Sequence, residues 1–172
     1  MASVEVKKEK FLISLGVVSD LGNDYYDNLL RKAIDLVERE MNKEDFMHII
    51  GVLNISVDLS LLIMYEGEEV DLEVVRLATI FHDVMLNKVK FENHAVRSAN
   101  RFIDFVVKQR INLSQKQIDN IVHCIRSHSA RCDGRLEEPS SIEAQIVFDA
   151  NMLQRLSDSG IFCLLKIAKK KM

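Results

Sequence analysis

The chain has 172 residues, with 23 Lys+Arg, 26 Asp+Glu, six Gly and one Pro, and 48% of its residues are hydrophobic. A domain of this size buries roughly 70% of the surface of its unfolded chain, so it needs neither disulfides nor a structural metal in order to fold. A net charge of −3 provides no basic surface for sequence-independent nucleic-acid binding. Three cysteines without a CxxC pair are typical of a reducing compartment, and they predict a cytoplasmic protein.

The first residues loosely resemble a signal peptide, because lysines precede the apolar stretch 11–18. Glu5 and Glu9 dilute the positive charge, and Ser19 and Asp20 stand where small cleavage-site residues would be expected. No apolar run approaches the ~18 residues of a membrane span. We therefore expect neither export nor a membrane partner. The amphipathic stretch 11–18 leaves a homodimer open.

Apolar residues recur at spacings of three and four almost throughout, and this period predicts a single all-α domain over residues 1–172. Helix starts are marked by Asp71 before an apolar run, and by Ser114 with Gln117 as a capping box. The segment 129–140 is expected to be a long loop and a candidate lid. In chain order we expect helices over about residues 4–14, 24–41, 44–65, 71–86, 92–109, 114–128, 141–156 and 158–169.

Several ionisable residues lie on the apolar stripes of their predicted helices, where they need a partner or a metal. Asp149, for example, lies on an almost wholly apolar face of its predicted helix, together with Ile142, Ile146, Met152, Leu153 and Leu156. His94 instead aligns with Arg97 and Ser98, so it is expected to face solvent or the rim of a pocket. The residues predicted to face the core are His48, His82 with the adjacent Asp83, His128 and Asp149.

Each of these residues alone has an ordinary explanation. A buried histidine is usually a hydrogen-bonded core residue, and a buried aspartate often caps a helix or pairs with an arginine. Three imidazoles and two carboxylates that face one core are together better explained by a bound metal ion.

The order His48, His82-Asp83 and Asp149 on an all-α chain resembles the HD-domain superfamily of metal-dependent phosphohydrolases. Three segments are similar to the family's central helix, its histidine turn and its C-terminal aspartate helix, namely 73–84, 125–129 and 142–150. The resemblance covers about residues 46–165 and implies a helical bundle of the HD type, with residues 1–43 as an N-terminal helical extension.

The resemblance implies that one divalent ion is held by His48, His82, Asp83 and Asp149. Two nitrogen and two oxygen donors suit Mn²⁺, Fe²⁺, Co²⁺, Ni²⁺ or Mg²⁺ and leave about two octahedral positions for water and substrate. Such an ion activates water for attack on phosphorus. The expected reaction is hydrolysis of a phosphomonoester or pyrophosphate linkage in a small molecule, with a nucleotide as the favoured substrate.

Further roles follow from the same resemblance. Asp83 and His128 are the expected catalytic residues, the first orienting the nucleophilic water and the second donating to a phosphoryl oxygen. Lys88 and His94 are candidate substrate contacts. Asn151 departs from the family pattern, which usually has a second Asp at this position.

Two other functions stay open. A binuclear enzyme, as in the phosphodiesterase or oxygenase branches, would use His94, His123 or His128 in a second metal shell. His94 follows Asp83 by only 11 residues, a spacing that disfavours this arrangement. A helical module could also bind nucleotide or metal without turning a substrate over.

Overall fold

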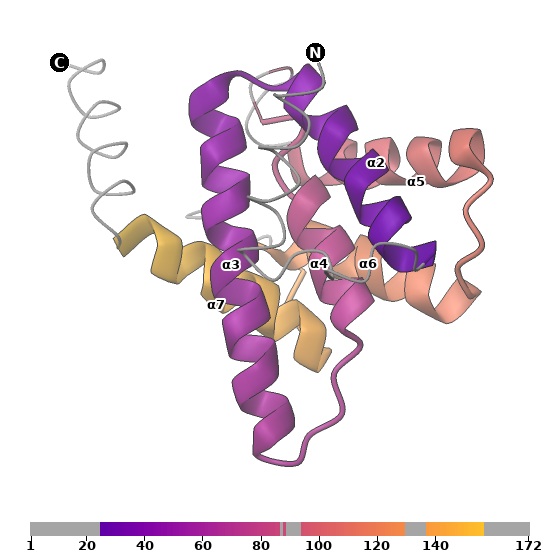
Figure 1. Ribbon diagram of the computed structural model, residues 1–172. Coiled ribbons are helices and arrows are strands. Elements are labelled where there is room, and N and C mark those ends of the chain that lie inside the picture. Colours follow the sequence, from indigo (N-terminus) through magenta and orange to yellow (C-terminus); the bar gives the residue numbers. More distant parts are fainter. Residues whose placement is uncertain (1–24, 87, 89–93, 130–136, 157–172) are drawn as a thin grey trace, which may run out of the picture.

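The computed structural model describes residues 25–86, 88, 94–129 and 137–156. These residues form helices and no strand, which confirms the all-α fold (Figure 1). The predicted helices over 4–14 and 158–169, and much of the predicted loop, lie outside the described residues. The helices are α2 (Tyr25–Glu40), α3 (Lys43–Tyr65), α4 (Leu72–Phe81), α5 (His94–Gln109), α6 (Gln115–Ser127) and α7 (Ile142–Leu156).

The helix starts follow the capping signals in the sequence. The Asp71 carboxylate accepts hydrogen bonds from the backbone N–H groups of Glu73 and Val74, and so caps α4. Ser114 and Gln117 form the predicted capping box at the start of α6. Such caps satisfy N–H groups that have no partner within the helix.

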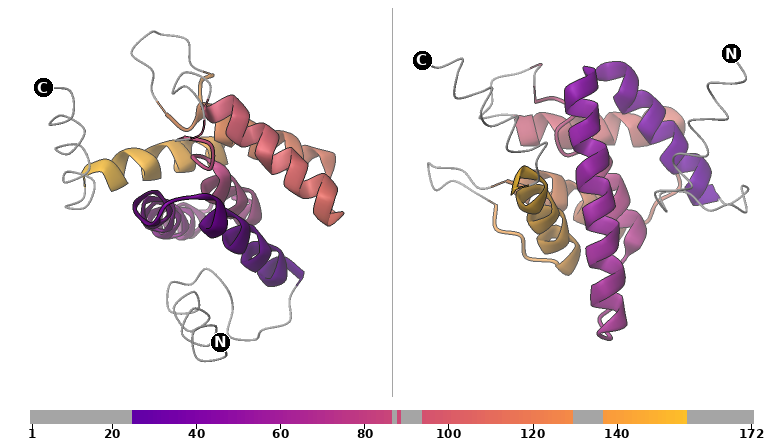
Figure 2. Two further views of the ribbon diagram at one scale, coloured as in Figure 1. Left: turned by 90° about the horizontal axis from the view of Figure 1, so that it is seen from above. Right: turned by 60° about the vertical axis from the view of Figure 1, so that its left-hand side comes forward.

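The short helix α4 lies at the centre of the bundle. Seven of its residues are buried, and it contacts α2, α3, α5, α6 and α7. Figure 2 shows α5 and α6 side by side on one flank of the molecule, with α3 and α7 crossing on the other. Both ends of α4 are therefore surrounded by side chains from several helices.

Helix α4 is shorter than the predicted 71–86, because the chain leaves the helix after Phe81 and continues in turns through Leu86. The His82 ring accounts for part of this ending, since its Nδ1 bonds to the carbonyl oxygen of Thr79 at 2.7 Å. From α5, Ser98 Oγ accepts the backbone N–H of Met85 at 3.2 Å. These side chains satisfy backbone groups near a helix end, where the helical pattern cannot.

Helix α3 differs from expectation in one respect. Its 23 residues include a window of mean hydropathy 1.9, so by length and composition alone it could cross a membrane. The expectation that no segment reaches this threshold is therefore wrong. Helices in protein cores pass the same test, and α3 packs against α2, α4 and α7.

Candidate metal centre

His82 and Asp83 lie directly after the last residue of α4, in the middle of the bundle. Both are buried, with exposed fractions of 0% and 2%. The ring of His82 is held by its bond from Nδ1 to the Thr79 carbonyl, which leaves Nε2 on the side of Asp83, 3.5 Å from Oδ2. The end of α4 thus presents a nitrogen and a carboxylate to one small volume.

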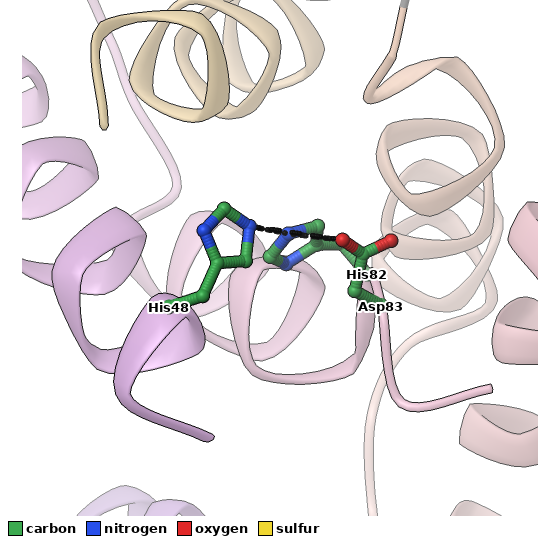
Figure 3. Close-up of side chains that lie close together, drawn as sticks. All are labelled: His48, His82 and Asp83. Atoms are coloured by element: carbon green, nitrogen blue, oxygen red, sulfur yellow. Dashed lines mark hydrogen bonds and ion pairs between the residues drawn. The ribbon is translucent and has the colours of Figure 1, made fainter. Parts of the chain in front are cut away.

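His48 of α3 completes a first group of ligands with these two residues (Figure 3). Its Nε2 lies 3.7 Å from Asp83 Oδ2 and 3.3 Å from His82 Nε2. Its Nδ1 bonds to Gln154 Oε1 of α7 at 2.7 Å. The three ligand atoms lie within 4.8 Å of one another, close enough to share one ion.

The other oxygen of Asp83 faces a second group, formed with His94 and His128. Oδ1 lies 3.3 Å from His94 Nε2 and 3.2 Å from His128 Nε2, and these two nitrogens are 3.3 Å apart. All three residues are buried, and the ligand atoms again lie within 4.8 Å of one another. His128 is oriented by a 2.6 Å bond from Nδ1 to the Ile125 carbonyl. Asp83 therefore belongs to both groups, with one oxygen in each.

The hydrogen bonds at Nδ1 determine which nitrogen of each ring carries the proton. Carbonyl oxygens accept only from N–H, so Nδ1 carries a proton in His48, His82 and His128, and the lone pair of each ring in its neutral form is at Nε2. The Nε2 atoms of His48 and His82 then face each other at 3.3 Å with lone pairs on both. Two such lone pairs repel unless a cation lies between them.

The carboxylate has the protonation state that a metal requires. Burial alone would raise the pKa of Asp83, but the positive charge that His82 and His128 carry when protonated, with N–H donation from His128 and His94, outweighs burial and holds the pKa well below its usual range. Burial lowers the pKa of His82 to about 3, against the opposing charge of Asp83. Near neutral pH, Asp83 is therefore ionised and His82 is neutral, as metal ligands must be.

The surroundings of Asp83 Oδ1 also fit a cation. It is buried, yet it accepts no well-formed hydrogen bond from the residues that the structure describes. A buried carboxylate oxygen without a donor is costly, because it has lost its hydration. Imidazole nitrogens and a shared carboxylate are the donor set that Mn, Fe, Co, Ni and Zn ions take in proteins, so these residues fit a divalent metal.

The comparison with protein families agrees with this geometry. A family model described as the HD domain matches residues 45–156, more than half of the chain. The chain belongs to the HD-domain superfamily of metal-dependent phosphohydrolases. No curated protein and no solved structure gives a significant match.

Asp149 does not take the place expected of it in this HD domain. It is exposed, so the prediction that it faces the core is wrong, and the argument for it as a metal ligand is lost. The buried face of α7 instead includes Val147 and Asn151. Asp149 lies two residues from each of them, so its side chain points to the opposite side of the helix. The apolar residues Leu153 and Leu156, which suggested the wrong face, are themselves exposed.

Two amides of α7 reach the metal centre in place of that carboxylate. Asn151 is fully buried, and its Nδ2 donates to the His128 carbonyl at 3.1 Å. Gln154, one turn later, bonds to His48. Sequence reasoning missed Gln154 because a neutral amide has no charge to mark it as unusual in a core. The available signal was that Gln154 follows Asn151 by three residues and so lies on the same face of α7.

His94 is also placed differently from expectation. It is 2% exposed and lies in the second group of ligands, whereas a solvent or rim position was predicted. The face that it shares with Ser98 looked polar, but Ser98 is fully buried and bonded to the backbone of Met85. A small hydroxyl can therefore be buried on a helix face that looks polar, when a backbone N–H from another segment bonds to it.

The two remaining candidates lie outside both groups. Lys88 Nζ forms an ion pair with Glu40 Oε2 at 2.9 Å. His123 Nε2 accepts the backbone N–H of Ser140 at 3.0 Å. The prediction that Lys88 contacts a substrate phosphate stays a prediction.

Proposed function

We propose that this HD domain is a metal-dependent hydrolase that cleaves a phosphomonoester or pyrophosphate linkage in a small molecule, with a nucleotide as the favoured substrate. The observation that carries the proposal is Asp83, an ionised and buried carboxylate with imidazole nitrogens next to each of its oxygens. Membership of the HD-domain superfamily supports hydrolysis of phosphate compounds as the reaction class.

We further propose that the centre takes two divalent ions and not one. His48, His82 and Asp83 Oδ2 would hold the first ion, and Asp83 Oδ1, His94 and His128 would hold the second. Each ion then has three protein ligands, which leaves coordination positions for water and substrate oxygens. When bound, such ions lower the pKa of water and neutralise charge on phosphoryl oxygens.

The protein's own residues prepare the site for this chemistry. Among the residues that the structure describes, Asp83 supplies the one negative charge of the two ligand groups and belongs to both. The backbone carbonyls of Thr79 and Ile125 hold the proton of the neutral His82 and His128 rings at Nδ1, so that the lone pair is at Nε2. A neutral His128 in this form has no proton at Nε2 to donate, so we assign it as a ligand in place of the predicted phosphoryl donor.

The proposal is tested by the metal content and activity of protein purified without chelator or added metal. Elemental analysis of the wild type is expected to give up to two transition-metal ions per chain, and phosphomonoesters and nucleoside triphosphates are screened with the same ion. Asp83→Asn keeps the shape of the side chain and removes its charge, so it is expected to abolish metal retention and turnover. Asp149→Ala is the matched control, because its exposed carboxylate should affect neither.

Two results would contradict the proposal. Wild-type protein that retains no metal, and takes up none of Mn²⁺, Co²⁺, Ni²⁺ or Mg²⁺, would exclude the metal centre. Metal lost in Asp83→Asn but no turnover of any phosphate ester would leave a metal-binding module without catalysis.

A further inference from the structure

The three histidines with known Nδ1 partners are oriented in two different ways. His82 and His128 each follow the last residue of a helix, and each bonds to a carbonyl three residues earlier. Carbonyls in the last turn of a helix lack helical partners, so they can accept a side-chain bond. The orientation of these two rings is built into their own helices.

His48 has no such local acceptor, because it lies inside α3, where the carbonyls of the preceding turn are used by the helix itself. Its acceptor comes from a different helix, 106 residues away in the sequence: Gln154 Oε1 of α7, at 2.7 Å. Gln154 is 6% exposed, so its amide is buried where it meets the ring. The orientation of His48 thus depends on a tertiary contact.

Gly51 provides the space for this contact. It lies three residues after His48, on the same side of α3. A Cβ atom at this position would lie 3.1 Å from Gln154 Cγ and 3.3 Å from its Nε2, closer than such atoms normally approach. Glycine inside a helix is less favourable than alanine, and nothing in the backbone here requires it. The glycine at position 51 is therefore best explained by the space that the Gln154 side chain occupies.

We infer that Gln154, lying in the space left by Gly51, is a positioning residue that keeps His48 protonated at Nδ1 with its Nε2 lone pair toward Asp83. The inference rests on the proposed metal centre for its consequence, since an unprotonated Nε2 is what a metal ligand requires. The proton position itself can be measured without any metal.

The first test is the tautomer of His48 in metal-free, ¹⁵N-labelled protein at about pH 8.5, well above the usual imidazole pKa of ~6.5. Long-range ¹H–¹⁵N spectra distinguish Nδ1–H from Nε2–H, and the His48 signals are assigned by their loss in His48→Leu. The wild type should show Nδ1–H. Gln154→Leu should lose this preference, whereas Gln154→Glu, which keeps an acceptor of the same length, should retain it. Gln145→Leu, an exposed glutamine of α7, is the control and should change nothing.

Gly51→Ala provides an independent variant that changes no polar group. Alanine should strengthen α3 as a helix, so a general loss of folding is not expected. If its methyl group displaces Gln154, the His48 tautomer should shift as it does in Gln154→Leu. Circular dichroism and thermal melting confirm that each variant is folded.

The second test is metal affinity by calorimetric titration with Mn²⁺. Loss of a partner that orients a ligand typically weakens metal binding 10–100-fold. Gln154→Leu should weaken one binding step by this factor and leave the other unchanged. Unchanged tautomer and affinity in Gln154→Leu would overturn the inference. If the wild type binds no metal, the proposed function fails, and the tautomer measurement alone decides the role of Gln154.

Discussion

The two ends of α4 each hold a buried carboxylate, and the two differ in what surrounds them. At the N-terminal end, Glu143 of α7 is 8% exposed and accepts two hydrogen bonds. The backbone N–H of Asp71 bonds to Oε1 at 3.0 Å, and Asn120 Nδ2 bonds to Oε2 at 2.9 Å. At the C-terminal end, Asp83 is 2% exposed and faces imidazole nitrogens.

The difference distinguishes a structural carboxylate from a functional one. N–H donors from α6 and from the start of α4 compensate the charge of Glu143, so it connects three helices. The nitrogens nearest Asp83 Oδ2, on His48 and His82, carry lone pairs in the neutral Nδ1–H form of each ring and cannot donate in that form. A buried anion next to lone pairs is stabilised by a cation, whereas a buried anion next to N–H groups needs none.

The largest expected effect that separates the two ends is the stability gained from metal. A ligand present at 100 times its dissociation constant stabilises the folded state by about 2.7 kcal/mol, so two ions, each at 100 times the dissociation constant of its own binding step, would contribute about 5 kcal/mol. Asp83→Asn should remove this increment, which thermal melting with and without Mn²⁺ measures directly. An undiminished metal-dependent rise in melting temperature would show that Asp83 does not hold the ions.

Single histidine variants separate the two groups of ligands. His48→Leu should remove the first ion and His94→Leu the second, each reducing the metal increment by about 2.7 kcal/mol under the same conditions. Native mass spectrometry should then count one ion per chain in either variant and two in the wild type. Equal counts in the wild type and His94→Leu would exclude the second ion.

Glu143→Gln should have the opposite profile from Asp83→Asn. An amide at this position cannot accept from both N–H donors, and a buried donor left unsatisfied costs about 1–3 kcal/mol. We expect the melting temperature to fall with and without metal, while the increment from Mn²⁺ stays as in the wild type. If Glu143→Gln lost the rise in melting temperature that Mn²⁺ causes, the two ends of α4 would not be independent.

Glu40 offers a smaller effect at a third, partly exposed carboxylate. It bonds to Arg101 and Lys88, and the hydrogen bond from Arg101 is the main reason that its pKa is lowered from 4.5 to about 2. A pKa that is lower in the folded state stabilises the fold above pH 4.5, and this contribution is lost as the pH falls toward 2. Glu40→Gln should therefore cost about 1 kcal/mol near neutral pH.

Denaturant unfolding at several pH values checks this expectation. The difference between Glu40→Gln and the wild type should shrink steadily below pH 4.5. A difference that is constant from neutral pH down to pH 3 would mean that the ion pairs of Glu40 do not contribute to stability.

The helices and part of the metal centre could be predicted because they depend on residues that are close together in the sequence. His82 and His128 share the faces of apolar neighbours such as Val75 and Ile121, and all four are fully buried. A period of 3.6 residues makes such faces visible in the sequence. Asp149 failed the same reasoning because exposed leucines at the end of α7 resembled a core stripe.

The sequence by itself determined the all-α architecture, the helix caps and the membership of the HD-domain superfamily, since all three are recorded in local spacing and short motifs. The tertiary structure alone decided that His94 joins Asp83, that Asn151 faces inward in place of Asp149, and that Gln154 orients His48. The physical reason is that a polar side chain is buried when another helix supplies its partner. That partner lies far away in the sequence, where helical periodicity contains no information about it.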